Sequence, residues 1–348
     1  MSGRRVLVVH ELVGGFGGAE RYLELLGPAL GARGVSASLA VFGARDGREA
    51  NADRLREAFA GGATEPGTTT PWALRRVVRA ERPDLIHWNV FEPFIFRGAT
   101  IAALPWGRPS VVTDHLPMMR NGRHYELTRR LANRRFAAMI VVGEAGAQAA
   151  REHWRRLPPL RVVRNGVEVS QSRRRKPPGE GPARLLFVGR LTAQKNPLFA
   201  LRVLDALRAR GVDAELTFVG DGELAPELRG DGVQLMGFVQ DVIPHLLDAH
   251  LLLAPAEFEG LPLAPIEALA TGLPVLASDI PPHRELAALS PALQVLPAVD
   301  PEAWAERAVA MLGELSELSE AATATREAFS VDRMADETVA VYEQVLRR

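Results

Sequence analysis

The chain alternates short, continuous apolar runs with longer segments of helical periodicity. The helical periodicity is clearest over residues 19–33 and near 72–81. Strands are predicted at six apolar runs: 5–10, 36–42, 84–90, 110–115, 138–143 and 160–166. Apolar strands without polar alternation are typical of a parallel sheet that is covered on both faces. The first half of the chain therefore predicts a Rossmann-like α/β domain.

The alternation breaks at residues 168–183 and then restarts. This segment, EVSQSRRRKPPGEGPA, is polar and rich in Pro and Gly, which is typical of a linker. Further strands are predicted at 184–190, 214–220, 233–237, 251–255, 274–278 and 293–297, and an amphipathic helix at the end of the chain.

We therefore expect an α/β protein with two Rossmann-like parallel-sheet domains that face each other across a cleft. The N-terminal domain is predicted over 1–167, the linker over 168–183 and the C-terminal domain over 184–330. The C-terminal helix, 331–348, is expected to pack back on the N-terminal domain.

Composition narrows the class of protein. The 348 residues are 47% hydrophobic and 24% charged, as in a soluble globular protein. No apolar run approaches the roughly 18 residues of a membrane span. The first apolar run is short and carries His10 and Glu11, so we expect no signal peptide and a cytoplasmic protein. The absence of cysteine excludes disulfides, thiol chemistry and cysteine-based zinc sites.

The net charge of zero hides an asymmetry between the two halves. Residues 1–165 hold 25 Arg against 15 Asp and Glu, and the remainder holds 17 Lys and Arg against 27 Asp and Glu. A basic half can attract an anionic partner, although two solvated surfaces that differ in charge explain the counts equally well. Only two lysines occur, Lys176 and Lys195, which singles out Lys195 in its glycine-containing loop.

Two glycine-containing loops follow predicted strands. GGFGGAER, residues 14–21, lets the backbone approach an anion at the start of a helix, but Glu20 stands where a dinucleotide fingerprint needs glycine. FVGRLTAQKNP, residues 187–197, places Arg190 and Lys195 before a helix, as a diphosphate site requires. A tight turn and a surface loop are the respective alternatives.

The segment EFEGLPLAPIEALATGLP, residues 257–274, lies between two predicted strands. It holds Glu259 in a loop and Glu267 in the first turns of the following helix, with seven residues between them. Carboxylates accept hydrogen bonds from paired hydroxyls such as those of ribose and hexose. The alternative is that the glutamates only complement the positive end of the helix dipole in the first turn. Asp221 and Glu223 in FVGDGE form a loose acidic pair, for which a turn is favoured over a Mg²⁺ site.

Together these segments resemble the retaining glycosyltransferase family 4, of the GT-B fold. The resemblance covers nearly the whole chain and rests on six motifs in the order of the family: GGAER, VVTDH at 111–115, RNGV at 164–167, VGRLTAQKN, VGDGE, and EFEGLPLAPIEALATGLPVLAS with its E-x7-E motif. Two departures are Pro262, which removes one backbone N–H, and Gly143-Glu144, where the family usually has a serine.

The resemblance implies roles for individual residues. Arg190 and Lys195 would grip the diphosphate of a nucleotide-sugar donor, Glu259 would contact the transferred sugar, and His115 would face the donor sugar or the acceptor. Glu267 would bind the ribose, and Gly237, Phe238 and Val239 would hold the base. The remaining donor-binding residues would be Gly17, Gly18, Gly189, Gly260, Leu261, Pro262 and Leu263.

The resemblance also implies transfer with retention of configuration, without a metal and without a cofactor. UDP is the expected nucleotide, with GDP and TDP as alternatives, and the acceptor is expected to be a small molecule or a cell-envelope hydroxyl. We expect no nucleic-acid partner. A nucleotide-sugar epimerase on the same fold and a non-catalytic nucleotide-sugar or glycan-binding protein are the competing interpretations.

The segment RNGRHYELTRRLANRRF predicts a dependence on salt. Its six arginines are expected to attract an anionic acceptor or a membrane surface, unless they form only the solvated side of an amphipathic helix whose other face holds Leu127 and Leu131. The Debye length is about 10 Å at 0.1 M salt, so the KM for the acceptor should rise steeply from low to high ionic strength. Charge reversal at Arg129 and Arg130 should mimic the effect, and flat kinetics would favour a neutral acceptor.

Overall fold

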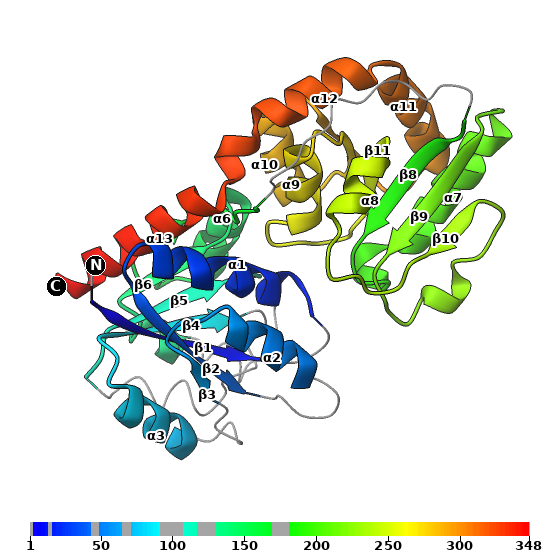
Figure 1. The fold of residues 1–348 in the computed structure, drawn as a ribbon. Coiled ribbons are helices and arrows are strands. Elements are labelled where there is room, and N and C mark those ends of the chain that lie inside the picture. Colours follow the sequence, from blue (N-terminus) through cyan, green and yellow to red (C-terminus); the bar gives the residue numbers. More distant parts are fainter. Residues whose placement is uncertain are drawn as a thin grey trace. The chain divides into compact units, whose positions relative to one another are not determined.

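The computed structural model describes residues 3–12, 16–42, 49–64, 71–90, 107–116, 130–168 and 181–347. The chain forms two compact units, which Figure 1 shows as ribbons. Unit 1 is Met1–Gly166 together with Val331–Arg348, and unit 2 is Val167–Ser330. The end of the chain thus belongs to the same unit as its beginning.

Unit 1 is built on a seven-stranded sheet with the order β3-β2-β1-β4-β5-β6-β7. All of its neighbouring strands pair in parallel. The strands are β1 (Arg5–Glu11), β2 (Ser36–Phe42), β3 (Ala63–Thr64), β4 (Leu85–Val90), β5 (Ser110–Asp114), β6 (Ala138–Val141) and β7 (Leu160–Val162). The inner strands β4, β5 and β6 are buried along their whole length, which explains their continuous apolar character.

Helices cover both faces of this sheet. One face packs against α1 (Gly18–Ala32), α2 (Glu49–Glu57) and α13 (Val331–Leu346), whose apolar residues share a core with Val6, Val8 and Leu39. The other face packs against α3 (Pro71–Glu81) and α6 (Glu144–His153) in a second core around Trp88. Two apolar layers therefore bury the sheet, as expected of a parallel α/β domain.

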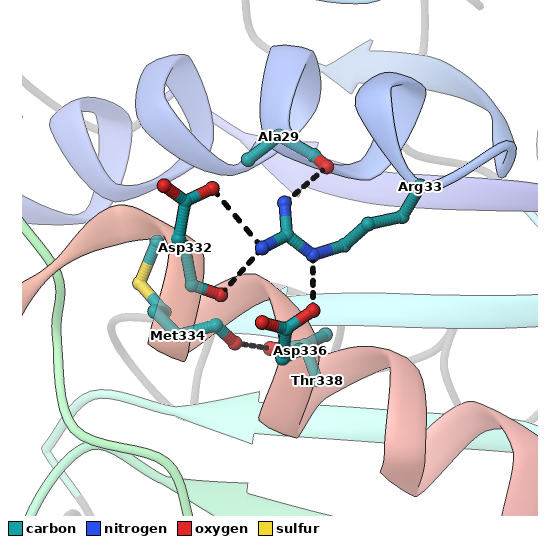
Figure 2. A network of polar contacts seen from close by, with 6 residues as sticks. All are labelled: Ala29, Arg33, Asp332, Met334, Asp336 and Thr338. Atoms are coloured by element: carbon teal, nitrogen blue, oxygen red, sulfur yellow. Dashed lines mark hydrogen bonds and ion pairs between the residues drawn. The ribbon is translucent and has the colours of Figure 1, made fainter.

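The C-terminal helix α13 is tied to α1, beside which it runs (Figure 1). The guanidinium group of Arg33, which follows α1, donates to the carboxylate of Asp336 at 2.6 Å, to the backbone carbonyl and carboxylate of Asp332, and to the carbonyl of Ala29 (Figure 2). Deeper in the unit, the hydroxyl of Tyr342 lies 2.5 Å from Nδ1 of His87 on β4. Polar and apolar contacts thus both fasten α13 to unit 1.

Unit 2 has a six-stranded sheet with the order β10-β9-β8-β11-β12-β13, again parallel throughout. Its strands are β8 (Ala183–Val188), β9 (Ala214–Val219), β10 (Val233–Leu235), β11 (Leu251–Ala254), β12 (Val275–Ser278) and β13 (Leu293–Leu296). Its helices are α7 (Pro197–Ala209), α8 (Ile243–Asp248), α9 (Leu263–Ala270), α10 (Pro281–Leu289), α11 (Pro301–Gly313) and α12 (Leu315–Ala324). Trp304 of α11 packs edge-on against Phe199 of α7 in its core.

Each sheet reverses its strand order beside its first strand. In unit 1, β1 lies between β2 and β4, and in unit 2, β8 lies between β9 and β11. Such switch points, at the carboxyl ends of parallel strands, are where open α/β sheets bind ligands. The predicted fold class, an α/β protein with two Rossmann-like parallel-sheet domains, is confirmed.

Some local expectations differ from the structure. Leu131, which the amphipathic-helix alternative placed on the face opposite the arginines, is 42% exposed, whereas Ala132 and Phe136 lie in the core. The last strand of unit 1 is shorter than its apolar run, since β7 ends at Val162. Most of the predicted linker, residues 169–180, lies outside the described residues. Within the described part of the chain, no helix has the length and apolarity needed to cross a membrane.

The bond between Tyr342 and His87 generates a prediction about stability. Tyr342→Phe removes the hydroxyl and leaves Nδ1 of a fully buried imidazole without this partner, which should cost about 1–3 kcal/mol. We expect faster amide exchange in β4 and α13 and no change in unit 2, measured by hydrogen exchange on the full chain. Unchanged protection of β4 would contradict a stabilising role for this bond.

Candidate functional site

The loops after β8, β9 and β10 are joined by backbone hydrogen bonds. Gly189 N donates to Val219 O at 2.9 Å, Leu191 N to Asp221 O at 2.8 Å, and Gly220 N to Gly237 O at 2.8 Å. Gly220 has a φ of +137°, and a Cβ atom there would lie 1.9 Å from the carbonyl oxygen of Gly189. Glycine is therefore required at 220 for the loops to approach this closely.

Lys195 and Glu259 form an ion pair in unit 2. Lys195 lies in the loop after β8 and Glu259 in the loop after β11, so the two strands at the switch point each supply one partner. Both side chains are mostly buried, with 20% and 11% exposed. The pair concentrates a cation and a carboxylate at the ligand-binding edge of the sheet.

Gln194 connects the same two loops and orients Arg190. Its side-chain amide donates to Phe258 O at 2.9 Å, its backbone carbonyl accepts from Glu257 N at 2.8 Å, and its Oε1 accepts from the guanidinium group of Arg190 at 2.8 Å. Arg190 is exposed, whereas Lys195 is partly buried. The loop thus presents two cations, one of which is open to solvent.

Glu267 lies one helical turn into α9 and is 7% exposed. Pro262 is the N-cap residue of α9, and both it and Leu261 are buried. Gly272, with a φ of +79°, follows the helix, as predicted. Glu267 is therefore a buried carboxylate, whereas a glutamate that only complements the helix dipole would be expected to face solvent.

The predicted base-binding segment follows β10. Gly237 has a φ of +67° and accepts the bond from Gly220, while Phe238 is 53% exposed. Asp221 does not face a cluster of carboxylates: its Oδ1 accepts from Gly222 N at 2.8 Å. Among the described residues, no group of three or more His, Asp or Glu side chains is placed to hold a metal ion.

His283 is a site residue that the sequence analysis missed. It lines a small pocket together with Lys195 and Glu259, and its ring is buried. Nδ1 contacts the carbonyl of Ser278 at 2.9 Å and so carries a hydrogen, which leaves Nε2 as a buried lone pair without a described partner. Burial lowers the pKa of His283, although the charge of Glu259 opposes this. A histidine in the first turn of a helix after a buried strand was the available signal.

In unit 1, the glycine loop is closed by Glu20. Its Oε2 accepts from Gly17 N at 2.9 Å, and its Oε1 lies 3.0 Å from Nε2 of His10 at the end of β1. Glu20, which breaks the dinucleotide fingerprint, therefore caps α1 from within. Gly18 is the first residue of that helix.

His115 lies at the end of β5 and joins the same network. Its Nε2 is 2.8 Å from Oδ1 of Asn89 on β4, and Nδ2 of Asn89 is 3.2 Å from Nδ1 of His10. Burial lowers the pKa of His115 to about 3. His115 is therefore a neutral imidazole at physiological pH.

The structure thus brings the predicted residues together in two groups. Unit 2 gathers Gly189, Arg190, Lys195, Gly237, Phe238, Val239, Glu259, Gly260, Leu261, Pro262, Leu263 and Glu267 on the loops and helix starts at the carboxyl edge of its sheet. Unit 1 joins Gly17 to His115 through Glu20, His10 and Asn89. Of the basic segment, Arg120, Arg123 and Arg129 lie outside the described residues.

Both halves of the chain match known families. Residues 16–171 match the family described as Glycosyltransferase Family 4, and residues 182–314 match the one described as Glycosyl transferases group 1. The crystal structure of Anabaena HepE in complex with UDP and glucose has a TM-score of 0.79, with 17% identity over 98% of this chain and 100% of that one. Staphylococcus aureus TarM has a TM-score of 0.78 at 10% identity, over 100% of this chain and 99% of that one.

Curated relatives match over shorter segments. A GDP-mannose-dependent α-(1-6)-phosphatidylinositol dimannoside mannosyltransferase of Mycobacterium tuberculosis is 30% identical over 60% of each chain. The UDP-Gal:α-D-GlcNAc-diphosphoundecaprenol α-1,3-galactosyltransferase of Escherichia coli is 36% identical over 27% of each chain. The chain thus spans about a quarter to three-fifths of the length of these relatives.

The close approach at Gly220 generates a prediction. Gly220→Ala forces a Cβ atom into the carbonyl of Gly189 and strains φ, so unit 2 should lose more than about 1 kcal/mol and the loops after β8 and β9 should separate. Gly313→Ala is the matched control, because its Cβ atom would meet nothing within 4 Å and alanine suits the end of α11. Thermal unfolding and amide exchange of Gly189 and Leu191 measure the effect. Equal behaviour of the two variants would contradict the required glycine.

Proposed function

Because the chain belongs to glycosyltransferase family 4, we propose that it transfers a sugar from a nucleotide-diphosphate donor to a hydroxyl group of an acceptor. The observation that carries the proposal is the site in unit 2. At the carboxyl edge of its sheet, Arg190, Lys195 and Glu259 lie on the two loops of the switch point. Glu267 lies in the helix that follows the second loop, and the exposed ring of Phe238 follows the outer strand β10. These groups match the diphosphate, hydroxyls and base of a nucleotide sugar.

Each part of the donor has a proposed partner. Arg190 and Lys195 bind the diphosphate, and Glu267 accepts hydrogen bonds from the ribose. Phe238 packs against the base, beside the backbone groups of Gly237 and Val239. Gly17 and Gly18 supply N–H groups at the start of α1, whose dipole favours negative charge.

The proposed chemistry follows from the charges that develop. Breaking the bond between sugar and phosphate leaves negative charge on the diphosphate, which Arg190 and Lys195 stabilise. Glu259 holds Lys195 in place before the donor binds and contacts the sugar afterwards. Because both cations are already oriented by Gln194 and Glu259, little reorganisation is needed during the reaction.

We further propose that the configuration at the anomeric carbon is retained and that no metal is required. The acceptor attacks the face from which the diphosphate leaves, and a phosphate oxygen takes the proton of the acceptor hydroxyl. No carboxylate is therefore assigned as a general base. The proposal that no metal is required is supported by Asp221, whose carboxylate accepts a hydrogen bond from Gly222 N within a turn.

UDP is the proposed nucleotide and an anionic cell-envelope molecule the proposed acceptor. UDP appears with HepE and in the name of the Escherichia coli relative, whose acceptor is a diphosphoundecaprenol. The Mycobacterium tuberculosis relative is GDP-mannose-dependent and acts on a phosphatidylinositol dimannoside, so GDP is the alternative. An anionic acceptor agrees with the excess of arginine in residues 1–165.

The experiment that tests this function is a panel of UDP-, GDP- and TDP-sugars. Binding is followed by thermal shift, and transfer by release of the nucleotide with a lipid-diphosphate glycan acceptor, in buffer with EDTA or with Mg²⁺. We expect one donor to raise the melting temperature and to be consumed equally with EDTA. Conversion of the donor to its epimer without acceptor would favour an epimerase, and binding without turnover a binding protein. A strict Mg²⁺ requirement would overturn the metal-independent mechanism.

The two glutamates are predicted to act differently. Glu267→Ala should weaken binding of the free nucleotide diphosphate by about 1.5–3 kcal/mol, because the ribose contact is equal in ground and transition states. Glu259→Ala should mainly lower kcat, since contacts to the reacting sugar strengthen as charge develops. Calorimetry and steady-state kinetics measure both variants.

The control for these variants is Glu257→Ala, an exposed carboxylate in the same loop as Glu259. We expect its nucleotide affinity and kcat to stay near those of the wild-type protein. Unchanged nucleotide affinity in Glu267→Ala would remove Glu267 from the ribose site.

A further inference from the structure

Four buried polar residues form one chain of hydrogen bonds in unit 1. This series of hydrogen bonds links Glu20 on α1 to His10 at the end of β1, His10 to Asn89 on β4, and Asn89 to His115 after β5. Their exposed fractions are 8%, 1%, 1% and 6%. Because none of these groups exchanges freely with water, the hydrogens in the chain must be distributed so that every contact joins a donor to an acceptor.

The charge of the Glu20 carboxylate decides how the hydrogens are distributed among these residues. Burial works against ionisation of Glu20, but its hydrogen bonds to His10 and to the backbone of Gly17 prevail, and the pKa of Glu20 is lowered. An ionised carboxylate can only accept. Gly17 N and His10 Nε2 are therefore both donors to Glu20, and Nε2 of His10 carries a hydrogen.

The side-chain amide of Asn89 contacts both imidazoles, so the position of the hydrogen on His10 determines its position on His115. Nδ1 of His10 lies 3.2 Å from the amide Nδ2 of Asn89, and an amide nitrogen can only donate, so Nδ1 accepts and the hydrogen of His10 lies on Nε2. The oxygen of the same amide, Oδ1, then faces Nε2 of His115 at 2.8 Å. An amide oxygen can only accept, so Nε2 of His115 carries the hydrogen and Nδ1 carries the lone pair.

We propose that Asn89 is a positioning residue that holds His115 as its neutral Nε2–H tautomer, so that Nδ1 accepts a hydrogen bond from a sugar hydroxyl. The tautomer follows from the orientation of the Asn89 amide, with Oδ1 toward His115 and Nδ2 toward His10, whereas the hydroxyl partner rests on the proposed glycosyltransferase function. The same network ties Gly17 to His115, so the glycine loop and the imidazole are ordered together. The competing arrangement has a reversed amide and a doubly protonated His10, and it would make Nδ1 of His115 a donor.

Among the described residues, the other groups close to His115 have partners of their own. Tyr22 of α1 contacts the imidazole edge-on, with ring centroids 4.9 Å apart. His87 on β4 is occupied by Tyr342 and Thr113, and burial lowers its pKa to about 3. The carboxylate of Asp114 accepts from Leu116 N. Asn89 is thus the described group that decides the tautomer.

The first experiment reads the tautomer directly. The full chain, labelled with ¹⁵N-histidine, is examined by long-range ¹H–¹⁵N correlation between pH 6 and 8, and the signal of His115 is identified by its loss in His115→Gln. We expect a protonated Nε2 and an unprotonated Nδ1 across this range. An Nδ1–H tautomer, or an imidazolium, would overturn the proposal, whether or not the protein transfers sugar.

The second experiment replaces the amide. In Asn89→Asp the carboxylate accepts from both imidazoles, which should raise the pKa of His115 because the cation gains a partner. In the wild-type protein His115 stays neutral above a pKa of about 3. In the variant, kcat should therefore fall as pH decreases through the raised pKa, so the acid limb of the pH profile moves upward while the donor KM changes little.

Asn89→Leu removes the acceptor altogether. We expect a mixed tautomer of His115 and a fall in kcat of about tenfold to a hundredfold, the range seen when a histidine ligand loses its outer hydrogen-bond partner. Asn133→Asp is the matched control, a buried amide of unit 1 that bonds to the carbonyl of Arg156 and lies outside the network. Its pH profile should match that of the wild-type protein.

The outcomes separate the two proposals. An unchanged tautomer and pH profile in both Asn89 variants would overturn the role of Asn89 even if sugar transfer is found. If no sugar is transferred by the wild-type protein, the proposed function fails, and the tautomer of His115 still decides the structural assignment. A variant that does not fold leaves the wild-type spectrum as the deciding measurement.

Discussion

In both sheets the strands that directly follow the first strand are added toward one edge of the sheet, and the later strands are added on the other side of the first strand. As a result β1 lies between β2 and β4, and β8 lies between β9 and β11. The loops that leave neighbouring strands at this reversal diverge, which opens a crevice at the carboxyl edge of the sheet. The ion pair of Lys195 and Glu259 and the network of His10 and Asn89 each span one such reversal, so the site chemistry depends on this topology.

The two units use polar groups in opposite ways at this edge. In unit 2, Lys195 and Glu259 remain partly exposed and Arg190 is open to solvent, so a ligand can exchange with their partners. In unit 1, Glu20, His10, Asn89 and His115 are buried and satisfy one another. Buried polar networks are costly unless every member is paired, but a paired network has one arrangement. We infer that unit 2 presents charged side chains to a ligand, whereas unit 1 fixes the orientation of its buried imidazole rings.

The helix α13, at the far end of the chain, takes part in a second set of buried hydrogen bonds in unit 1. Its Tyr342 bonds to His87, which bonds in turn to Thr113, two residues before His115. Arg33 holds the first turns of α13 against α1 (Figure 2). The strand that carries His115 is therefore supported by a segment more than two hundred residues away, so the support of the site requires the whole of unit 1 to fold.

Local pattern determined the elements, and tertiary pairing determined the site. Periodicity and turn residues are properties of neighbouring positions, so the sequence alone predicted the α/β class, most strands and helices, the loops that carry Arg190, Lys195 and Glu259, and the six motifs of the family. It did not show that Ala132 and Phe136, rather than Leu131, enter the core, because periodicity does not say which apolar residue reaches the core. The partners of His10, Asn89 and His283 were not predicted at all. His10 and Asn89 are 79 residues apart, and they meet only because β1 pairs with β4, a lateral order that no local pattern encodes.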